Sequence, residues 1–283
     1  MKNEETKQIR NLILDMDGVL WRGDTPMPGL AAFFDTLREL GIGFVLATNN
    51  ATKTAVQYSA KLAGFGVEIP PGQIVTSAEA TAAFLQTQYP PKTAVYAVGE
   101  QGLHDALTTH QFHLINYKEA MHENGDIPLV VVGFNRHVTY KDLAAAARLI
   151  HRGARFIGTN PDVSFPSEYG PLPGAGASLA FLQAATGIEP LIIGKPGPIL
   201  FQEAMHRLNG TTANTIMVGD RLNTDIAGAQ KAGLKAALVL SGITRPEHLA
   251  TSTIKPDFIF ADITDLANYL QGEKTAVSTH KKS

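Results

Sequence analysis

The stretch Leu12-Ile13-Leu14-Asp15-Met16-Asp17-Gly18 decides the fold. An apolar run ends in two aspartates that stand one residue apart, and a glycine follows. Such a run is typical of a buried strand in a parallel sheet, which binds its ligands at the carboxyl ends of its strands. Two carboxylates placed there repel each other and lose water, so each needs a cation or a proton. Taken alone, the stretch leaves an ordinary Asp-Gly turn as the alternative.

The length and composition fit a protein with a substantial buried core. The chain has 283 residues, of which 44% are hydrophobic and 18% charged, and its formal net charge is −2. Its longest basic run is Lys281-Lys282, which argues against nucleic acid and anionic membranes as partners. It has no cysteine, which excludes disulfides and thiolate metal sites. The first ten residues are unlike a signal peptide and no apolar stretch is long enough to span a bilayer, so we expect a soluble cytoplasmic protein.

Strand-like and helical segments alternate from end to end of the chain, which predicts an α/β fold with a parallel sheet covered by helices on both faces. The Pro90-Pro91 pair and the Pro/Gly-rich segment 161–176 break this rhythm. We therefore interpret residues 81–183 as an inserted α/β domain, and residues 1–80 and 184–283 as one discontinuous core domain. After the first strand, the expected strands are 43–47, 94–98, 129–132, 156–158, 191–193, 215–218, 236–240 and 258–260. The expected helices are 29–40, 54–62, 78–88, 103–109, 141–151, 175–185, 199–208 and 224–232.

Polar groups follow three more of the predicted strands. Thr48-Asn49-Asn50 offers a hydroxyl and amides that suit a phosphate oxygen, although the same residues are good helix N-caps. Lys195 leaves a buried strand between a glycine and a proline, and a solvated surface lysine is its alternative interpretation. Asp220 stands at the tip of another strand, and Asp225 follows it. Asp225 alone is also explained as a favourable charge at a helix N-terminus.

Together these side chains predict a magnesium-dependent site for phosphoryl transfer. Asp15, Asp17 and Asp220 supply the hard oxygen ligands that Mg²⁺ prefers. Asp15 would be the nucleophile, because a carboxylate is already ionised at neutral pH and forms an acyl phosphate that water hydrolyses. Lys195 and Mg²⁺ would neutralise the charge of the phosphoryl group. Asp17, on the same side of an extended chain, would protonate the leaving group; this requires a pKa above its usual value of about 4, which burial favours and Mg²⁺ opposes.

The sequence resembles the haloacid dehalogenase superfamily of aspartate-nucleophile phosphatases over almost its whole length, roughly residues 12–270. Four ordered motifs carry the resemblance: Asp15-Met16-Asp17-Gly18, Thr48, Lys195-Pro196, and Gly219-Asp220 with Asp225. Further stretches are similar to one branch, the NagD-like enzymes, 4-nitrophenylphosphatases and phosphoglycolate phosphatases. These stretches are Gly18-Val19-Leu20-Trp21, Thr48-Asn49-Asn50, Gly158-Thr159-Asn160-Pro161-Asp162, Pro173-Gly174-Ala175-Gly176, Gly194-Lys195-Pro196-Gly197 and Asp220-Arg221-Leu222-Asn223-Thr224-Asp225-Ile226.

The resemblance implies a Rossmann-like, doubly wound core with an α/β cap inserted between the second and third motifs. It also implies Mg²⁺ as the cofactor. Asp15 and Asp220 would bind the metal through their side chains and Asp17 through its carbonyl. Asp225 matches a position near the metal, and whether it binds the ion directly stays open.

The same resemblance implies how the phosphoryl group is held. Thr48, Asn49 and Lys195 would bind the phosphoryl group, and Asn223 matches a family position that completes the surroundings of the metal and the phosphate. We expect Trp21 to pack beside the first motif rather than to bind a ligand.

These features predict a phosphomonoesterase that acts on small phosphorylated metabolites through an aspartyl-phosphate intermediate. A cap that closes over the core would exclude phosphoproteins and shield the acyl phosphate. Two alternatives stay open: a phosphotransferase or mutase acting on sugar phosphates, and a metabolite-binding regulator without activity. Relatives in the family often pair through the cap, so a homodimer is also expected. The sequence does not distinguish between four classes of substrate: nucleoside monophosphates, phosphoglycolate, glycerol phosphates and sugar phosphates.

Overall fold

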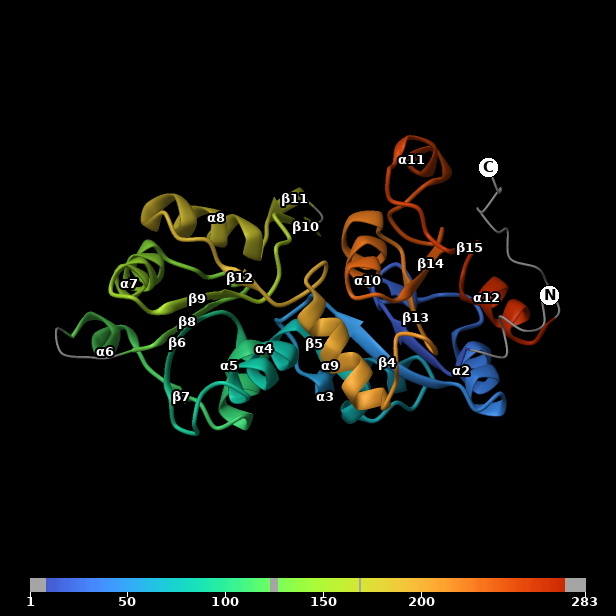
Figure 1. Cartoon of the computed structure of the whole chain (residues 1–283), viewed down its shortest axis with the longest axis horizontal. Helices are drawn as coiled ribbons and strands as arrows, with labels where there is room; N and C mark the ends of the chain where they lie inside the picture. The colour runs from blue at the N-terminus through green and yellow to red at the C-terminus, as the bar shows by residue number, and fades with distance from the viewer. Residues whose placement is uncertain (1–8, 123–126, 168, 273–283) are drawn as a thin grey trace. The chain divides into compact units, whose positions relative to one another are not determined.

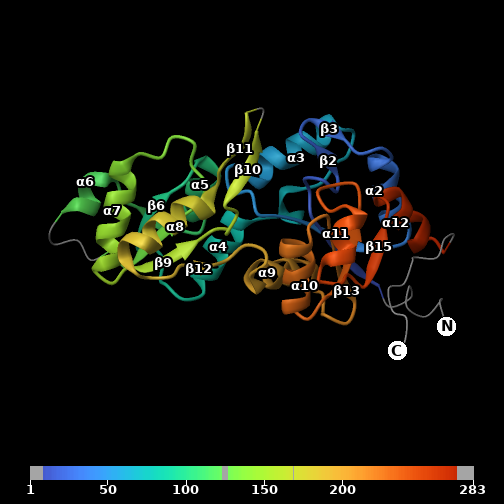
Figure 2. The same ribbon diagram turned by 90° about the horizontal axis from the view of Figure 1, so that it is seen from above.

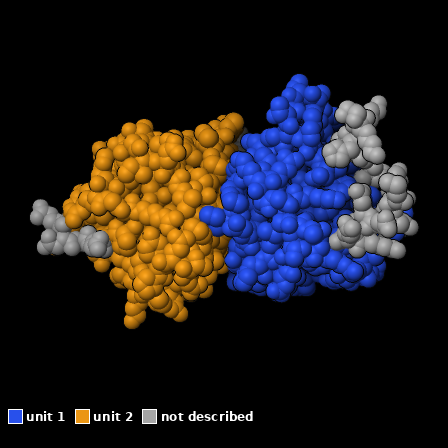
Figure 3. Space-filling view, viewed as in Figure 1, with its two compact units in different colours: residues 1–48, 56–75, 195–283 blue, residues 49–55, 76–194 orange. Residues whose placement is uncertain are grey.

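The chain divides into two compact units, drawn in different colours in Figure 3. A computed structural model describes residues 9–122, 127–167 and 169–272; residues 1–8 and the Lys281-Lys282 pair lie outside them. The described residues of unit 1 fall within Met1–Thr48, Val56–Val75 and Lys195–Ser283, and those of unit 2 within Asn49–Ala55 and Thr76–Gly194. The predicted core at 1–80 and 184–283 and the predicted cap at 81–183 stay a prediction.

A six-stranded sheet, in the order β15-β14-β13-β1-β4-β5, forms the centre of the described part of unit 1. β1 pairs in parallel with β4 and with β13, and β14 pairs in parallel with β13 and β15. The side chains of Leu12, Ile13 and Leu14 are buried, so the strand is covered on both faces as its apolar run predicts. The strands are β1 (Asn11–Leu14), β4 (Gly43–Thr48), β5 (Ile74–Thr76), β13 (Thr215–Gly219), β14 (Lys235–Val239) and β15 (Phe258–Phe260).

Helices cover both faces of this sheet, as Figures 1 and 2 show together. α2 (Leu30–Glu39) and α12 (Ile263–Leu270) pack together on one face, and α9 (Pro198–Leu208) and α10 (Ala227–Lys231) lie on the other. The buried residues of α2 recur at helical spacing, and the ring of Phe34 lies 5.0 Å from that of Phe44 in β4. Unit 1 also contains α3 (Ala55–Gly64), α11 (Pro246–Thr251), the short helical turns η1 (Pro71–Gln73) and η2 (Leu222–Ile226), and the antiparallel pair β2 (Trp21–Arg22) and β3 (Thr25–Pro26).

Unit 2 has a five-stranded sheet of its own within the described residues, in the order β12-β9-β8-β6-β7, and all its strand pairs are parallel. Its core lies between the sheet and the helices α6, α7 and α8, while α4 packs on α5. The strands are β6 (Ala94–Val98), β7 (His113–Leu114), β8 (Leu129–Val132), β9 (Arg155–Gly158) and β12 (Leu191–Ile192), and a separate antiparallel pair is formed by β10 (Ser164–Ser167) and β11 (Gly170–Pro173). The helices are α4 (Ser77–Gln86), α5 (Gln101–Thr109), α6 (Tyr117–Met121), α7 (Tyr140–His151) and α8 (Ala175–Thr186).

Two parallel sheets flanked by helices confirm the predicted α/β fold class. The predicted helix 224–232 differs in detail, because its first turn is the π-helical turn η2 and only the rest is α10. In that turn the amides of Asp225 and Ile226 both donate to the carbonyl of Arg221, at 3.1 and 3.2 Å. No helix in the part of the chain described by the structure is long and apolar enough to cross a membrane.

Candidate active site

Three neighbouring strands of unit 1 end at one edge of its sheet, because β1 is parallel to both β4 and β13. Asp15 follows β1, Thr48 is the last residue of β4, and Asp220 follows β13. These residues come from distant parts of the sequence, and the strand register brings them to a common edge. This is the edge at which parallel sheets place their ligands.

A tight turn after β1 sets the direction of the chain beyond Asp15. The amide of Gly18 donates to the carbonyl of Trp21 at 2.7 Å, and the amide of Leu20 donates to that of Met16 at 2.8 Å. Gly18 has a φ of +85°, and a β-carbon there would overlap the carboxylate of Asp220. Glycine is therefore required both by the backbone conformation and by the close approach of the acidic group.

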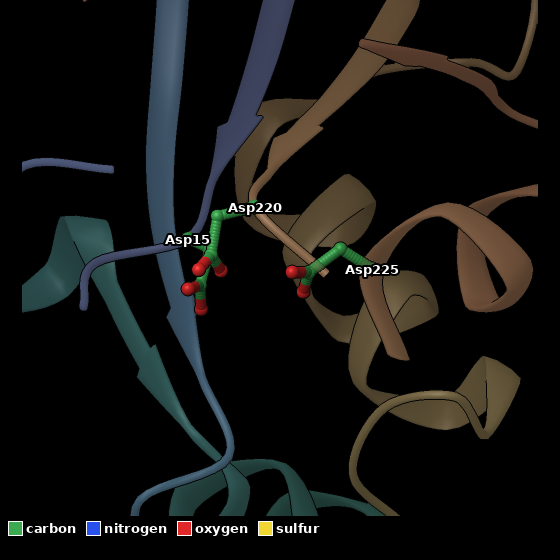
Figure 4. A group of neighbouring side chains, drawn as sticks. All are labelled: Asp15, Asp220 and Asp225. Atoms are coloured by element: carbon green, nitrogen blue, oxygen red, sulfur yellow. The ribbon is translucent and has the colours of Figure 1, made fainter. Parts of the chain in front are cut away.

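Three carboxylates gather at this edge, and Figure 4 shows their side chains. One oxygen from each of Asp15, Asp220 and Asp225 lies within 4.8 Å of the other two. The residues are 9%, 1% and 1% exposed, respectively. Like charges so close together and out of water are unstable unless positive charge or protons compensate them.

Lys195 supplies part of that positive charge from inside the protein. Its Nζ lies 2.5 Å from Oδ1 of Asp15 and 2.7 Å from Oδ1 of Asp225, and it donates to the carbonyl of Ala47 at 3.1 Å. Burial lowers the pKa of Lys195, but Asp15 and Asp225 outweigh burial and raise it above its usual value. The lysine is therefore a fixed cation between two carboxylates, and the interpretation as a solvated surface lysine is wrong.

One lysine does not balance three carboxylates. Burial raises the pKa of Asp15 well above its usual range, against the opposing effect of Lys195. Burial, together with the charge of Asp225, raises the pKa of Asp220 to about 6. Oδ1 of Asp220 is buried with no hydrogen-bond partner among the described residues. A buried carboxylate oxygen without a donor, next to two further carboxylates, fits a site for a divalent cation.

The other oxygen of Asp220 is held by the loop after β14. The amide of Ile243 donates to Oδ2 of Asp220 at 2.7 Å, and the hydroxyl of Ser241 donates to the carbonyl of Gly18 at 2.8 Å. A β-carbon at Gly242 would overlap the same carboxylate. We did not predict from the sequence that this loop belongs to the site. Like the four motifs, it directly follows a predicted strand, and that position could have identified it.

Asp17 lies apart from the three clustered carboxylates. Its residue is exposed, and its Oδ1 accepts a hydrogen bond of 2.7 Å from Nε1 of Trp21. Trp21 is fully buried beside the first motif, as expected, and its ring stacks on Tyr58 with centroids 6.2 Å apart. The buried hydroxyl of Tyr58 lies beside Thr48, and burial with the charges of Asp17 and Asp15 raises its pKa. Tyr58 could not be predicted from the sequence, because its position depends on the packing of α3.

The predicted phosphate-binding residues lie in different places. Thr48 is buried at the end of β4 in unit 1, and Asn223 is exposed in η2. Asn49 belongs to unit 2, where its side chain donates to Oδ2 of Asp162 at 3.3 Å and its carbonyl accepts from Ser77 at 2.6 Å. The structure thus brings Asp15, Asp220, Asp225 and Lys195 together, with Thr48 at the same sheet edge, while the phosphate-binding roles stay predictions.

Two family models match the chain. The model described as haloacid dehalogenase-like hydrolase matches residues 12–113, and a second model, HAD-hydrolase-like, matches residues 192–266. Together they cover the segments that carry Asp15, Thr48, Lys195, Asp220 and Asp225.

Named relatives and solved structures match along nearly the whole chain. The dihydroxyacetone phosphatase of Corynebacterium glutamicum is 39% identical over 256 residues, which is 90% of each chain. The crystal structure of 4-nitrophenylphosphatase from Thermotoga maritima is 36% identical with a TM-score of 0.87, and the match covers 94% of this chain and 99% of that one. The glycerol phosphate phosphatase Rv1692 of Mycobacterium tuberculosis, solved in complex with magnesium, is 31% identical with a TM-score of 0.83, over 93% of this chain and 77% of that one.

Proposed function

Because the chain belongs to the haloacid dehalogenase-like hydrolases and is a phosphatase of that family, we propose that it is a magnesium-dependent phosphomonoesterase that acts through an aspartyl-phosphate intermediate. The observation that carries this proposal is the buried Lys195 between Asp15 and Asp225, with Asp220 in the same group of carboxylates. The lysine favours the charged form of an acidic nucleophile, and the remaining acids match a metal site.

The carboxylates of Asp15 and Asp220 and the carbonyl of Asp17 would hold Mg²⁺. Asp225 lies 2.7 Å from Lys195, so we assign it to the ion pair with the lysine. A bound divalent cation supplies positive charge that neutralises these carboxylates and the oxygens of a substrate phosphate. The donor-free, buried Oδ1 of Asp220 and the raised pKa of that group support the assignment.

In the first half of the reaction, a carboxylate oxygen of Asp15 attacks the phosphorus of the substrate. A bond forms between this oxygen and phosphorus while the bond from phosphorus to the leaving oxygen breaks. The leaving oxygen takes the electron pair of that bond and receives a proton from Asp17. Lys195, at 2.5 Å from Asp15, favours the ionised form of Asp15 that this step requires.

In the second half, water attacks the phosphorus of the aspartyl phosphate and gives a proton to Asp17, which regenerates the acid. The bond between phosphorus and Asp15 breaks, and inorganic phosphate leaves. In this proposal Lys195 and Thr48 bind phosphoryl oxygens from unit 1, and Asn49 and Asn223 contribute amide groups. A lysine ammonium has three donors, so binding phosphate requires Lys195 to share a donor that it now directs at a protein oxygen.

Small phosphorylated metabolites are the proposed substrates. The relatives named above carry the names of enzymes for dihydroxyacetone phosphate, glycerol phosphate and 4-nitrophenyl phosphate, which are all phosphomonoesters of small alcohols or phenols. Neither nucleic acid nor membrane is a proposed partner. A homodimer formed through the predicted cap is part of the proposal, and sedimentation of the purified protein tests it.

Release of inorganic phosphate from 4-nitrophenyl, glycerol and sugar phosphates tests the proposal directly. The purified chain is assayed with Mg²⁺ and with EDTA, beside Asp15→Asn and the exposed control Asp35→Asn. We expect turnover with Mg²⁺ in the native chain and in Asp35→Asn, and no turnover with EDTA or in Asp15→Asn. Turnover by Asp15→Asn at a native rate would overturn the nucleophile. With a sugar bisphosphate, an isomeric bisphosphate in place of inorganic phosphate would identify a mutase instead.

A further inference from the structure

We propose that Trp21 is a positioning residue that fixes the orientation of the Asp17 carboxylate and determines which of its two oxygens delivers the proton. This inference rests on the proposed role of Asp17 as the acid and base. It starts from the hydrogen bond of 2.7 Å that Nε1 of Trp21 donates to Oδ1 of Asp17.

The donor in this hydrogen bond is rigid. Trp21 is fully buried, and its ring is stacked on Tyr58 with an interplanar angle of 18°. The ring of Phe65 lies 6.1 Å away, and Nζ of Lys61 lies 4.9 Å from the indole ring. Lys61 also donates to the carbonyl of Gly23 at 2.6 Å, which ties it to the chain just beyond the tryptophan. An aromatic ring enclosed in this way cannot rotate without displacing its neighbours.

The acceptor, in contrast, stands on an exposed residue. An exposed aspartate side chain samples several rotamers unless a partner selects one. Asp17 and Trp21 belong to the same tight turn, in which Gly18 donates to the carbonyl of Trp21, so the turn fixes both ends of the hydrogen bond. Hydrogen bonds to an ionised carboxylate are shorter and stronger than those between neutral groups. The buried indole therefore selects one orientation for an otherwise free catalytic side chain.

The indole also determines which oxygen carries the proton. An indole N–H is only a donor, so the atom that it faces must accept. Oδ1 of Asp17 accepts from Trp21 whether the carboxyl group is ionised or protonated, and because the carbonyl oxygen of a carboxylic acid is a better acceptor than its hydroxyl oxygen, this hydrogen bond favours the acidic proton on Oδ2. In the first half of the reaction this proton passes from Oδ2 to the leaving oxygen, and in the second half Oδ2 takes one from water.

Kinetics with leaving groups of different quality test the proposal. Trp21→Phe keeps an aromatic ring in the stack and removes the N–H donor. Proton donation by a general acid contributes about 10²- to 10⁴-fold, so we expect loss of its positioning to lower kcat on alkyl phosphates about tenfold or more. On 4-nitrophenyl phosphate, whose leaving group needs little protonation, we expect a loss of about twofold or less, with KM unchanged on both substrates.

Two comparisons separate positioning from damage to the fold. Phe258→Leu removes a ring from a separate aromatic cluster of unit 1, formed with Phe260 and Tyr269, and leaves the hydrogen bond and its enclosure in place, so we expect both substrates to be turned over at the native rate. In an Asp17→Asn background, Trp21→Phe should cause no further loss on alkyl phosphates. An equal loss on both substrates in Trp21→Phe, or an undiminished loss in the Asp17→Asn background, would overturn the proposal.

A spectroscopic measurement keeps the proposal testable even where Trp21→Phe fails to fold. Trp21 is the single tryptophan of the sequence, so a sample labelled with ¹⁵N at the indole gives one indole N–H signal. We expect Asp17→Ala to move that signal and to speed its exchange with solvent, and the proposal fails if the signal stays in place. If Asp17→Asn itself lowers activity equally on both substrates, the acid role of Asp17 fails, whatever the indole signal shows.

Discussion

Replacing Lys195 with methionine keeps a long side chain in the buried site and removes its positive charge. In the native protein the ammonium group lies 2.5 Å from a carboxylate oxygen of Asp15 and 2.7 Å from one of Asp225. Without it, two buried carboxylates face each other, and Asp220 stands within the same group. The variant therefore isolates the contribution of internal positive charge to the stability of the site.

The expected loss of stability follows from the two distances. At an effective dielectric constant of about 20, each contact is an attraction of about 6 kcal/mol before the desolvation of the ions is counted. Desolvation offsets much of this, and removing one partner of a buried ion pair typically costs about 3 to 5 kcal/mol. Because Lys195 serves two carboxylates, we expect the unfolding free energy of metal-free Lys195→Met to fall by about 4 to 5 kcal/mol at pH 7.

Urea unfolding followed by tryptophan fluorescence measures the loss of stability of unit 1, which holds the site. Trp21 is the single tryptophan and lies in unit 1, so its emission follows the unit that holds the site. The control is Lys231→Met, which removes an exposed lysine from α10 in the same unit and should change stability by less than about 1 kcal/mol. A double-mutant cycle with Asp225→Asn should give a coupling energy of at least about 2 kcal/mol.

Two results would refute this reasoning. A loss in Lys195→Met that equals the loss in Lys231→Met would mean that the carboxylates do not depend on the lysine. A coupling energy near zero with Asp225→Asn would mean that the contact between the ammonium of Lys195 and the carboxylate of Asp225 does not stabilise the fold. The loss should also shrink at pH 5, because carboxylates without a cation take up protons more readily as the pH falls.

Further predictions concern Asp15, Asp220 and Gly242. Asp15→Asn should abolish phosphate release while its unfolding free energy stays equal to or above the native value, because the excess of buried negative charge falls while Lys195 keeps its contact with Asp225; a cooperative but strongly destabilised variant in urea would contradict this. The pKa of Asp220 is about 6 in the folded state and about 3.8 in the unfolded chain, so the folded state binds this proton more tightly. Protonated Asp220 therefore stabilises the metal-free protein below about pH 4. This contribution, about 3 kcal/mol in total, is lost as the pH rises to about 6. The difference between native and Asp220→Asn unfolding curves across that range measures the effect, and a flat difference would reject it. Gly242→Ala should displace the Asp220 carboxylate and lower activity at limiting Mg²⁺ about tenfold or more. The control Gly64→Ala, which has open space at its β-carbon, should keep the native activity. Equal activities of the two variants would show that the loop after β14 tolerates a side chain at residue 242.

The parts of the fold that follow from local pattern were predictable from the sequence. The strands 94–98, 129–132 and 258–260 have the predicted limits, because each is an apolar run between turn residues. The pairs β2–β3 and β10–β11 were not predicted. Their strands are two to four residues long and lack an alternating apolar pattern, so their existence depends on contacts that periodicity does not reveal.

The site divides in the same way. Asp15 and Asp220 were predictable because each stands where a buried strand ends, and parallel strands end at a common edge. The expected buried strand before Lys195 is wrong in detail, because β12 is half-buried, belongs to the other sheet and ends three residues before the lysine. The separation of Asp17 from the three clustered carboxylates was not predictable, because it depends on the turn at Gly18 and on the hydrogen bond from Trp21. Strand alternation places two side chains on the same side but says nothing of a turn that begins between them.

The central strand of unit 1 has a consequence for synthesis on the ribosome. β1 pairs on one side with β4, which follows closely in the sequence, and on the other side with β13, where Asn11 stands opposite Thr215. Until residue 215 has emerged, a nascent chain exposes one edge of this buried strand, and until residue 195 has emerged it carries Asp15 without the lysine that follows 180 residues later. Open strand edges invite aggregation, so premature termination anywhere before β13 yields a fragment that is both inactive and prone to association.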